Sequence, residues 1–146
     1  VSKFKARIAG CGGFVNITQN THKVVFCGTF TAKGLREEIR DGKLVITHEG
    51  AVQKFIDKVG QITFSAEYAH KHNQQVMFIT ERCVFVLTDK GLVLTEIAPG
   101  VDLQKDILDQ MEFVPHIAEN LKTMDERLFR DEPMGLAQDI FEQQAG

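Results

Sequence analysis

The sequence predicts an α/β fold, in which helices and β-hairpins flank a mixed β-sheet. Residues 23–30 form a run of β-branched and aromatic side chains that is too short for a helix and too apolar for exposure on both faces. Two pairs of similar runs are each joined by a glycine-containing turn, and residues 102–111 show helical spacing. No repeat or linker divides the chain, so a single domain over residues 1–146 is expected.

The first predicted element is a loop, residues 10–13 (the glycine loop), which leads into a short helix over residues 14–20. Phe14 and Ile17, with Val15 as a possible third, would line one face of that helix. The apolar run at 23–30 that follows predicts an interior strand, because neither of its faces is suited to water.

Two hairpins are predicted from turn chemistry. Residues 35–40 and 43–48 flank Asp41-Gly42, a dipeptide that readily adopts the positive φ angles of a type I′ turn. Residues 83–88 and 92–97 flank a three-residue loop whose last residue, Gly91, suits a left-handed position. Residues 75–80, just ahead of this hairpin, predict another strand.

Helices are predicted in the remaining segments. Residues 65–72 favour a short helix, and Asp102 can cap a helix that carries apolar side chains at helical spacing up to residue 111. The tail from residue 116 predicts helical stretches separated by a breaker at residues 131–133, and this tail could pack on the edge of the sheet.

The composition excludes several classes of function. With 43% hydrophobic and 25% charged residues the chain can bury one core, and its net charge of -3 offers no cationic excess for nucleic acid. No apolar run approaches the roughly 20 residues that span a bilayer, so a cytoplasmic protein is expected. Cys11, Cys27 and Cys83 are interpreted as buried free thiols. The absence of an initial Met indicates a fragment.

The glycine loop is the most informative site candidate. Glycines let the backbone approach a ligand closely, and the N–H groups that begin a helix attract anions. An ordinary tight turn into a helix is the alternative, because the spacing matches neither a dinucleotide-binding motif nor a phosphate-binding P-loop. Cys11 could be a nucleophile activated by the helix start, or simply a small residue in a tight turn.

Other reactive side chains favour structural interpretations. The five histidines lack the spacing of metal ligands, so no metal site is predicted and each is interpreted as a surface or satisfied histidine. Glu81 and Glu96 lie in or beside apolar strands, where a carboxylate needs a partner such as Arg82 or a lysine. Both are interpreted as paired or edge carboxylates rather than catalytic ones.

Four segments in order resemble the C-terminal half of family I coenzyme A transferases, the acetate, propionate and 3-oxoacid type. They are AGCGGFVNITQN at residues 9–20, VVFCGTF at 24–30, ITERCVF at 79–85 and GLVLTEIAPGVDL at 91–103. The resemblance covers roughly residues 1–134 and implies a CoA-transferase-like half-domain. It also implies that coenzyme A and acyl-CoA are substrates rather than tightly bound cofactors.

The resemblance implies a mechanism in which a glutamate attacks the acyl-CoA thioester and then carries CoA as a glutamyl thioester. Gly12 or Gly13 would be the backbone oxyanion donor and Gly10 would shape the turn, while Gly10, Cys11, Phe14 and Asn16 would contact substrate. The family's nucleophilic glutamate lies upstream of a VSK-like segment, and this sequence begins with Val1-Ser2-Lys3. The nucleophile is therefore expected outside this chain.

The implied partners are an N-terminal CoA-transferase portion carrying that glutamate, an acyl-CoA, a short-chain carboxylate and further copies in a homo-oligomer, but neither nucleic acid nor membrane. Two alternatives stay open. The chain could be a non-catalytic module for acyl-CoA binding or assembly, which would bind CoA without transferring it. It could also be a cysteine hydrolase, in which Cys11→Ala would abolish activity without unfolding the chain.

Overall fold

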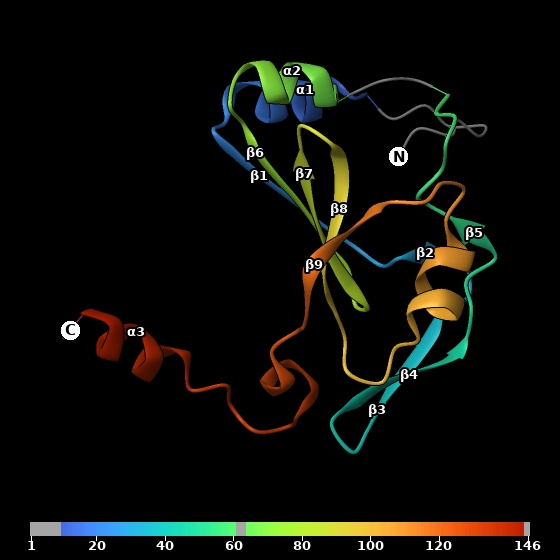
Figure 1. Cartoon of the computed structure of the whole chain (residues 1–146), viewed down its shortest axis with the longest axis vertical. Helices are drawn as coiled ribbons and strands as arrows, with labels where there is room; N and C mark the ends of the chain where they lie inside the picture. The colour runs from blue at the N-terminus through green and yellow to red at the C-terminus, as the bar shows by residue number, and fades with distance from the viewer. Residues whose placement is uncertain (1–9, 61–63, 145–146) are drawn as a thin grey trace.

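The computed structural model describes residues 10–60 and 64–144. A five-stranded sheet forms the centre of the molecule. Figure 1 shows its strands running from the end that carries α1 (Gly12–Asn20) and α2 (Ala66–Lys71) toward the middle of the molecule. In sheet order these strands are β1 (Lys23–Cys27), β6 (Gln75–Ile79), β7 (Cys83–Thr88), β8 (Gly91–Ile97) and β9 (His116–Thr123).

The sheet is mixed, as the sequence predicts. β1 pairs parallel with β6, the strands β6, β7 and β8 form an antiparallel meander, and β9 joins β8 in parallel. Two small two-stranded sheets accompany it, one of β2 (Thr31–Ala32) with β5 (Val52–Gln53) and one of β3 (Arg36–Arg40) with β4 (Lys43–His48). The predicted α/β class is confirmed.

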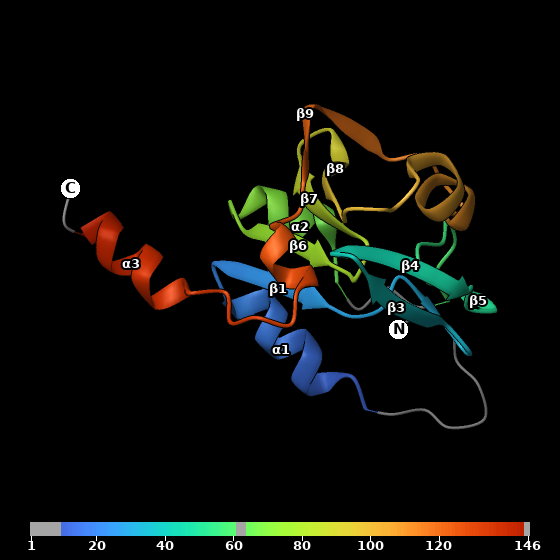
Figure 2. The same ribbon diagram turned by 90° about the horizontal axis from the view of Figure 1, so that it is seen from below.

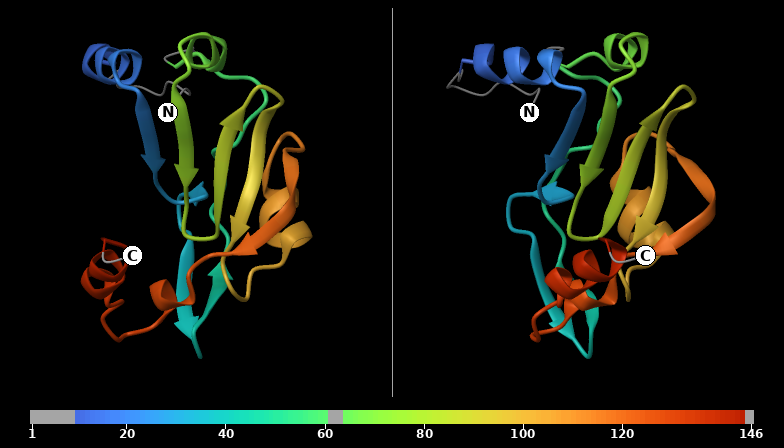
Figure 3. Two further views of the ribbon diagram at one scale, coloured as in Figure 1. Left: turned by 60° about the vertical axis from the view of Figure 1, so that its left-hand side comes forward. Right: turned by 90° about the vertical axis from the view of Figure 1, so that its left-hand side faces the viewer.

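Helices lie at the two ends of this sheet and beyond it. α1 (Gly12–Asn20) and α2 (Ala66–Lys71) lie together at one end, and the β3–β4 hairpin lies at the opposite end (Figures 1 and 3). The other helical segments are η1 (Leu103–Ile107), η2 (Leu108–Gln110), η3 (Glu126–Phe129) and α3 (Leu136–Gln144). α3 projects away from the body of the molecule (Figure 2).

Local chemistry explains both predicted hairpins. Asp41 and Gly42 have φ angles of 51° and 72°, the two positive values that a type I′ turn requires between β3 and β4. Gly91 has a φ of 101°, as its left-handed position demands, but it pairs with Thr88 and belongs to β8. The loop therefore has two unpaired residues, Asp89 and Lys90, rather than three.

Three expectations are corrected. The strand expected over residues 23–30 ends at Cys27, because its partner β6 ends at Ile79, whose carbonyl accepts a last bond from the Gly28 N–H at 3.1 Å. Within the described residues it is an edge strand rather than an interior one. The tail expected to be helical begins with β9, whose pairing with β8 shifts register between Leu94 and Glu96. The helix expected up to residue 111 is a π-helical turn followed by a 3-10 turn, although Asp102 caps it through the Lys105 N–H at 2.8 Å.

The core lies between the sheet and the segments that cross it. Phe30, Phe85, Leu94 and Ile107 are completely buried there, and each such side chain contributes about 1.5–3 kcal/mol by leaving water. Within the described residues, no helix has the length and apolar character that crossing a membrane requires.

Candidate functional site

The glycine loop ends in an uncapped helix N-terminus. α1 begins at Gly12, and Cys11 stands at the N-cap position without a side-chain hydrogen bond to the helix. The first intrahelical bond runs from the Val15 N–H to the Cys11 carbonyl at 3.0 Å. The N–H groups of Gly12, Gly13 and Phe14 precede that bond, so they have no acceptor within the helix.

Neither packing nor backbone conformation among the described residues requires glycine at positions 10, 12 and 13. Gly10, Gly12 and Gly13 are exposed, and a Cβ added to any of them would meet no described atom within 4 Å. None of the three has a positive φ angle, so backbone conformation does not demand glycine either. Glycines at these positions leave the backbone open to close approach by a group outside the described residues.

Aromatic packing and one glutamine hold α1 against the sheet. The Phe14 ring stacks on Phe26 of β1 with centroids 5.8 Å apart, and Phe26 stacks on Phe78 of β6 at 5.0 Å. The Gln74 Nε2 donates to the carbonyls of Thr18 and Thr21, each at 2.6 Å. These carbonyls belong to the last turn of α1 and to its C-cap, where the helix itself supplies no donor.

The structure brings the predicted site residues together on one helix end, but in different settings. Cys11 is half-buried, and the hydrogen bonds of the described residues include none from its thiol. Phe14 is 38% exposed and partly occupied by its stack on Phe26. Asn16 is exposed, and its side-chain oxygen accepts a bond from Asn20 Nδ2 at 2.9 Å.

The three cysteines differ in burial, whereas the five histidines are all exposed. Cys83 is buried, and burial raises the pKa of its thiol to about 12. The expectation that all three thiols are buried holds for Cys83 but not for the half-buried Cys11, and it is wrong for Cys27, which is exposed at the end of β1 with its side chain pointing away from the core. The histidines lie on the surface, as interpreted from the sequence.

A buried arginine forms the densest polar cluster among the described residues. Arg82 is fully buried, with its guanidinium 4.8 Å from the centroid of the Phe30 ring. Its Nε donates to Glu81 Oε1 and its Nη1 to Glu49 Oε2, both at 2.8 Å, and Nη1 also reaches the Asp106 carbonyl at 2.7 Å. Glu81 is thus a paired carboxylate, as expected from the sequence.

The two carboxylates are themselves held by further donors. The Phe30 N–H donates to Glu81 Oε2 at 2.7 Å, while Glu49 Oε1 accepts from the Thr31 hydroxyl and, at 3.0 Å, from the Gly50 N–H. Burial alone would raise the pKa of Glu49, but the bonds from Arg82, Thr31 and the Gly50 N–H outweigh it and lower that pKa. Sequence reasoning missed Glu49, because nothing local links it to Arg82.

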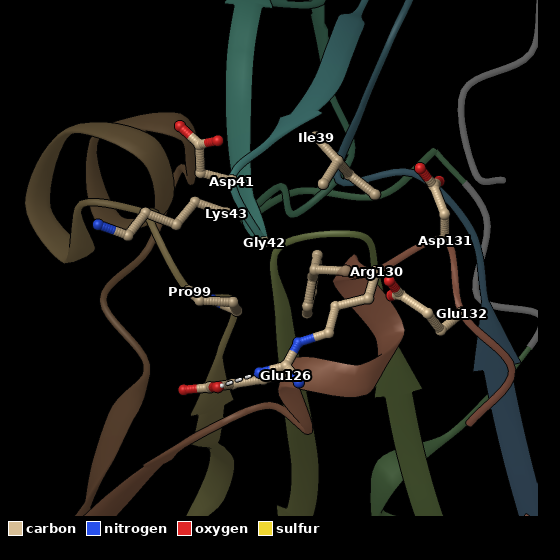
Figure 4. A pocket seen from close by; sticks show the side chains of 10 residues that line it. Ile39, Asp41, Gly42, Lys43, Pro99, Glu126, Arg130, Asp131 and Glu132 are labelled. Atoms are coloured by element: carbon tan, nitrogen blue, oxygen red, sulfur yellow. Dashed lines mark hydrogen bonds and ion pairs between the residues drawn. The ribbon is translucent and has the colours of Figure 1, made fainter. Parts of the chain in front are cut away.

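The cavities formed by the described residues include none that residues of the glycine loop line. One of about 510 Å³ opens between the β3–β4 turn and η3, lined by side chains of both charges, among them Lys43, Arg130 and Glu126 (Figure 4). Arg130 pairs there with Glu126 at 3.0 Å. The β3–β4 hairpin is at the end of the sheet opposite α1. Within the described residues, the candidate site is the uncapped N-terminus of α1.

Comparison with known proteins identifies what the chain resembles. It is 56% identical over 135 residues to the acetate CoA-transferase YdiF of Escherichia coli K12, and 52% identical over 141 residues to the caffeate CoA-transferase of Acetobacterium woodii. These matches cover 92% and 93% of this chain but 25% and 27% of the relatives. The chain thus spans about a quarter of their length. No protein-family model matches the sequence.

A solved structure agrees with these matches. The chain superposes with a TM-score of 0.89 and 56% identity on a crystal structure of the acyl-CoA transferase YdiF from Escherichia coli O157:H7, a thioester complex with CoA. That superposition covers 92% of this chain and 26% of the other. The resemblance to CoA transferases inferred from the four sequence segments is confirmed in sequence and in fold.

Proposed function

We propose that this chain is the C-terminal part of a short-chain acyl-CoA:carboxylate CoA-transferase. A glutamate on the upstream portion attacks the thioester carbonyl of acyl-CoA, and CoA leaves as a thiolate. The thiolate then attacks the glutamyl carbonyl of the resulting anhydride, which releases the first carboxylate and forms a glutamyl thioester. A second carboxylate reverses these two steps and departs as the new acyl-CoA, so the thioester bond is conserved throughout.

The observation that carries this proposal is the open helix N-terminus behind glycines that the chain itself does not need. Each attack on a carbonyl develops an oxyanion, and a preorganised N–H donor there is worth about 2.7–4 kcal/mol. The N–H of Gly12 or Gly13 serves as such a donor, and Gly10 shapes the turn that leads into α1. Cys11, Phe14 and Asn16 border the same end of α1 and line the substrate's path.

The comparisons support the substrate class. The relatives are named for acetate and for caffeate, which are both carboxylic acids, and the solved relative holds CoA as a thioester. CoA therefore enters as a substrate and not as a resident cofactor. We propose short-chain carboxylates as the exchanged acids, with acetate and propionate as the candidates to test, in a cytoplasmic homo-oligomer of short-chain fatty acid metabolism.

A hybrid polypeptide tests the function. In it, this chain replaces the segment that it matches in the Escherichia coli acetate CoA-transferase, and formation of propionyl-CoA from acetyl-CoA and propionate is measured. The hybrid should turn over, whereas this chain alone should not, because the nucleophile lies upstream. A folded hybrid without CoA transfer would contradict the proposal. CoA binding to the isolated chain, followed by calorimetry, would then favour the non-catalytic module.

Proline substitutions in the same hybrid test the oxyanion donor. Pro is tolerated in the first turn of a helix, where the N–H has no intrahelical acceptor, so Gly12→Pro and Gly13→Pro each delete one N–H of that turn. One of the two should lower kcat by about 10²–10³-fold. Gly12→Ala and Gly13→Ala keep the N–H and serve as controls, with circular dichroism as the check of folding. Equal kcat values in all four variants would contradict the assignment.

A further inference from the structure

β1 lies at the edge of the sheet among the described residues, but its side chains are typical of an interior strand. β1 pairs only with β6 among the described residues, yet its sequence, KVVFC, has the apolar character of an interior strand and carries one charged side chain, Lys23. The opposite edge strand, β9, is protected in the usual way, with Glu119, Asn120 and Lys122 all exposed. Figure 3 shows β1 at the open margin of the sheet.

The alternation of backbone hydrogen bonds along β1 shows which of its N–H and C=O groups face away from β6. The Gly28 N–H donates to the Ile79 carbonyl at 3.1 Å, and the His22 carbonyl accepts from the Gln75 N–H at 2.9 Å, so even-numbered residues point toward β6. Successive residues of a strand alternate in this direction. The N–H and C=O groups of Lys23, Val25 and Cys27 therefore point to the open side.

Apolar side chains flank this edge on both faces of the sheet. Val25, 43% exposed, lies on one face. On the other face α1 stacks against Phe26 through Phe14, and it exposes 66% of Ile17. Apolar side chains on both sides of a free strand edge are what an added strand would cover.

Resting on the proposed function, we propose that a strand of the polypeptide portion missing from this chain pairs with the outer edge of β1 and continues the sheet. The chain matches only about a quarter of its relatives' length, so three quarters remain to supply this strand. The pairing would lie beside the stacked Phe14 of α1, next to the candidate oxyanion donors. It would thus fix the portion carrying the nucleophile relative to the glycine loop.

Amide hydrogen exchange in the hybrid polypeptide tests the pairing. The amides of Val25 and Cys27 should exchange freely in the isolated chain and at least about 100-fold more slowly in the hybrid, whereas Val24 and Phe26, which face β6, should be protected in both. Protection of Val25 already present in the dilute isolated chain, or appearing there only as concentration rises, would overturn the inference. The first result would indicate an occupant within this chain, the second another copy of it.

A matched pair of variants provides a second readout. Val25→Pro removes the outward N–H and Val25→Thr keeps it with a side chain of similar shape, and Pro is tolerated where the N–H faces outward from an edge. Relative to Val25→Thr, Val25→Pro should lower the denaturation midpoint of the hybrid but not that of the isolated chain; equal shifts would overturn the inference. CoA transfer is scored separately: an active hybrid with unprotected Val25 contradicts only the pairing, and a protected but inactive hybrid contradicts only the proposed function.

Discussion

Arg82 joins three segments that are distant in the sequence. Its guanidinium contacts the Phe30 ring, the Glu49 carboxylate and the Asp106 carbonyl, and it is completely buried. A buried charge is tolerated only when its donors are satisfied, and here every nitrogen of the guanidinium donates to an oxygen. The arginine therefore fixes the loops at one end of β6 and β7 rather than adding a reactive group.

Arg82→Ala should destabilise the chain by about 3 kcal/mol, the lower end of the range for breaking a buried ion pair, because the carboxylates left behind keep some contact with water. Urea denaturation measures the change. Arg130→Ala is the matched control, since its pair with Glu126 is exposed on both sides and should contribute less than about 1 kcal/mol. Equal effects of the two substitutions would contradict this account of the buried cluster.

Two glutamates should respond to pH with opposite signs. The pKa of Glu49 is lowered in the folded chain, so its contribution to stability is present above the unfolded value of about 4.3 and is lost as pH falls through the folded pKa. Burial, then the nearby Glu81 carboxylate, raise the pKa of Glu37, so ionised Glu37 opposes folding at neutral pH.

Glu49→Gln should therefore reduce the free energy of unfolding at pH 7, with the deficit shrinking below about pH 4. Glu37→Gln should raise that free energy at pH 7, and its advantage should fade as acid protonates the native carboxylate. Denaturant titrations between pH 3 and pH 7 compare both variants with the unmodified chain. Parallel profiles for all three proteins would show that neither pKa is shifted.

At the scale of elements, Gly91 and Gly100 both have a positive φ angle, but only Gly100 is closely packed. Substituting each of them distinguishes the cost of backbone strain from the cost of steric crowding. Gly91 and Gly100 have φ angles of 101° and 90°, so alanine is strained at both. A Cβ at Gly91 meets nothing within 4 Å, whereas at Gly100 it would lie 2.8 Å from the Leu44 carbonyl and 2.9 Å from Lys43 Cβ.

Gly91→Ala should cost about 1–2 kcal/mol from strain alone, and Gly100→Ala should cost a further 1–3 kcal/mol, roughly, because β4 must move aside. Thermal or urea denaturation of the two single variants measures the difference. If the two alanines cost the same, the close packing of the segment after β8 on β4 would not be a source of stability.

The elements that could be predicted from sequence are those with local causes. The Asp41-Gly42 turn and the Asp102 cap are each set by a few adjacent residues. β9 could not be predicted, because its half-buried Ala118 and Leu121 are three residues apart, a spacing that also suits a helix. The irregular pairing with β8, in which Leu94 matches Ile117 but Glu96 matches Lys122, accommodates that spacing.

The same distinction applies to the candidate site. The start of α1 could be predicted from sequence because glycines adjoin a helical pattern, but the helix begins at Gly12, two residues earlier than expected, so Gly12 and Gly13 belong to α1 and not to the loop before it. The Glu49–Arg82 pair joins residues 33 positions apart, and the open edge of β1 depends on which strand arrives beside it. The sequence correctly predicts a strand at β1, but the strands that pair with β1 depend on the rest of the fold.

At the scale of the whole molecule, the candidate site should be less stable than the core of the sheet. The β7–β8 hairpin contains the fully buried Phe85 and Leu94, but α1 has one buried side chain, Thr18, and depends on its aromatic stack and on Gln74. Segments with few buried apolar contacts open at a lower free energy than the core. A site that another portion must complete is expected to be held in this way.

Gln74→Ala should therefore speed amide exchange in α1 by about tenfold, since each lost hydrogen bond is worth about 0.5–1.5 kcal/mol, and should leave β7 and β8 unchanged. Gln104→Ala is the control, because its bond to Asp109 Oδ1 lies on the surface of η1. Exchange followed by mass spectrometry on the isolated chain separates the two regions. Acceleration spreading equally into β7 and β8 would mean that α1 opens only with the whole molecule, and the site would then be as rigid as the core before any partner portion binds.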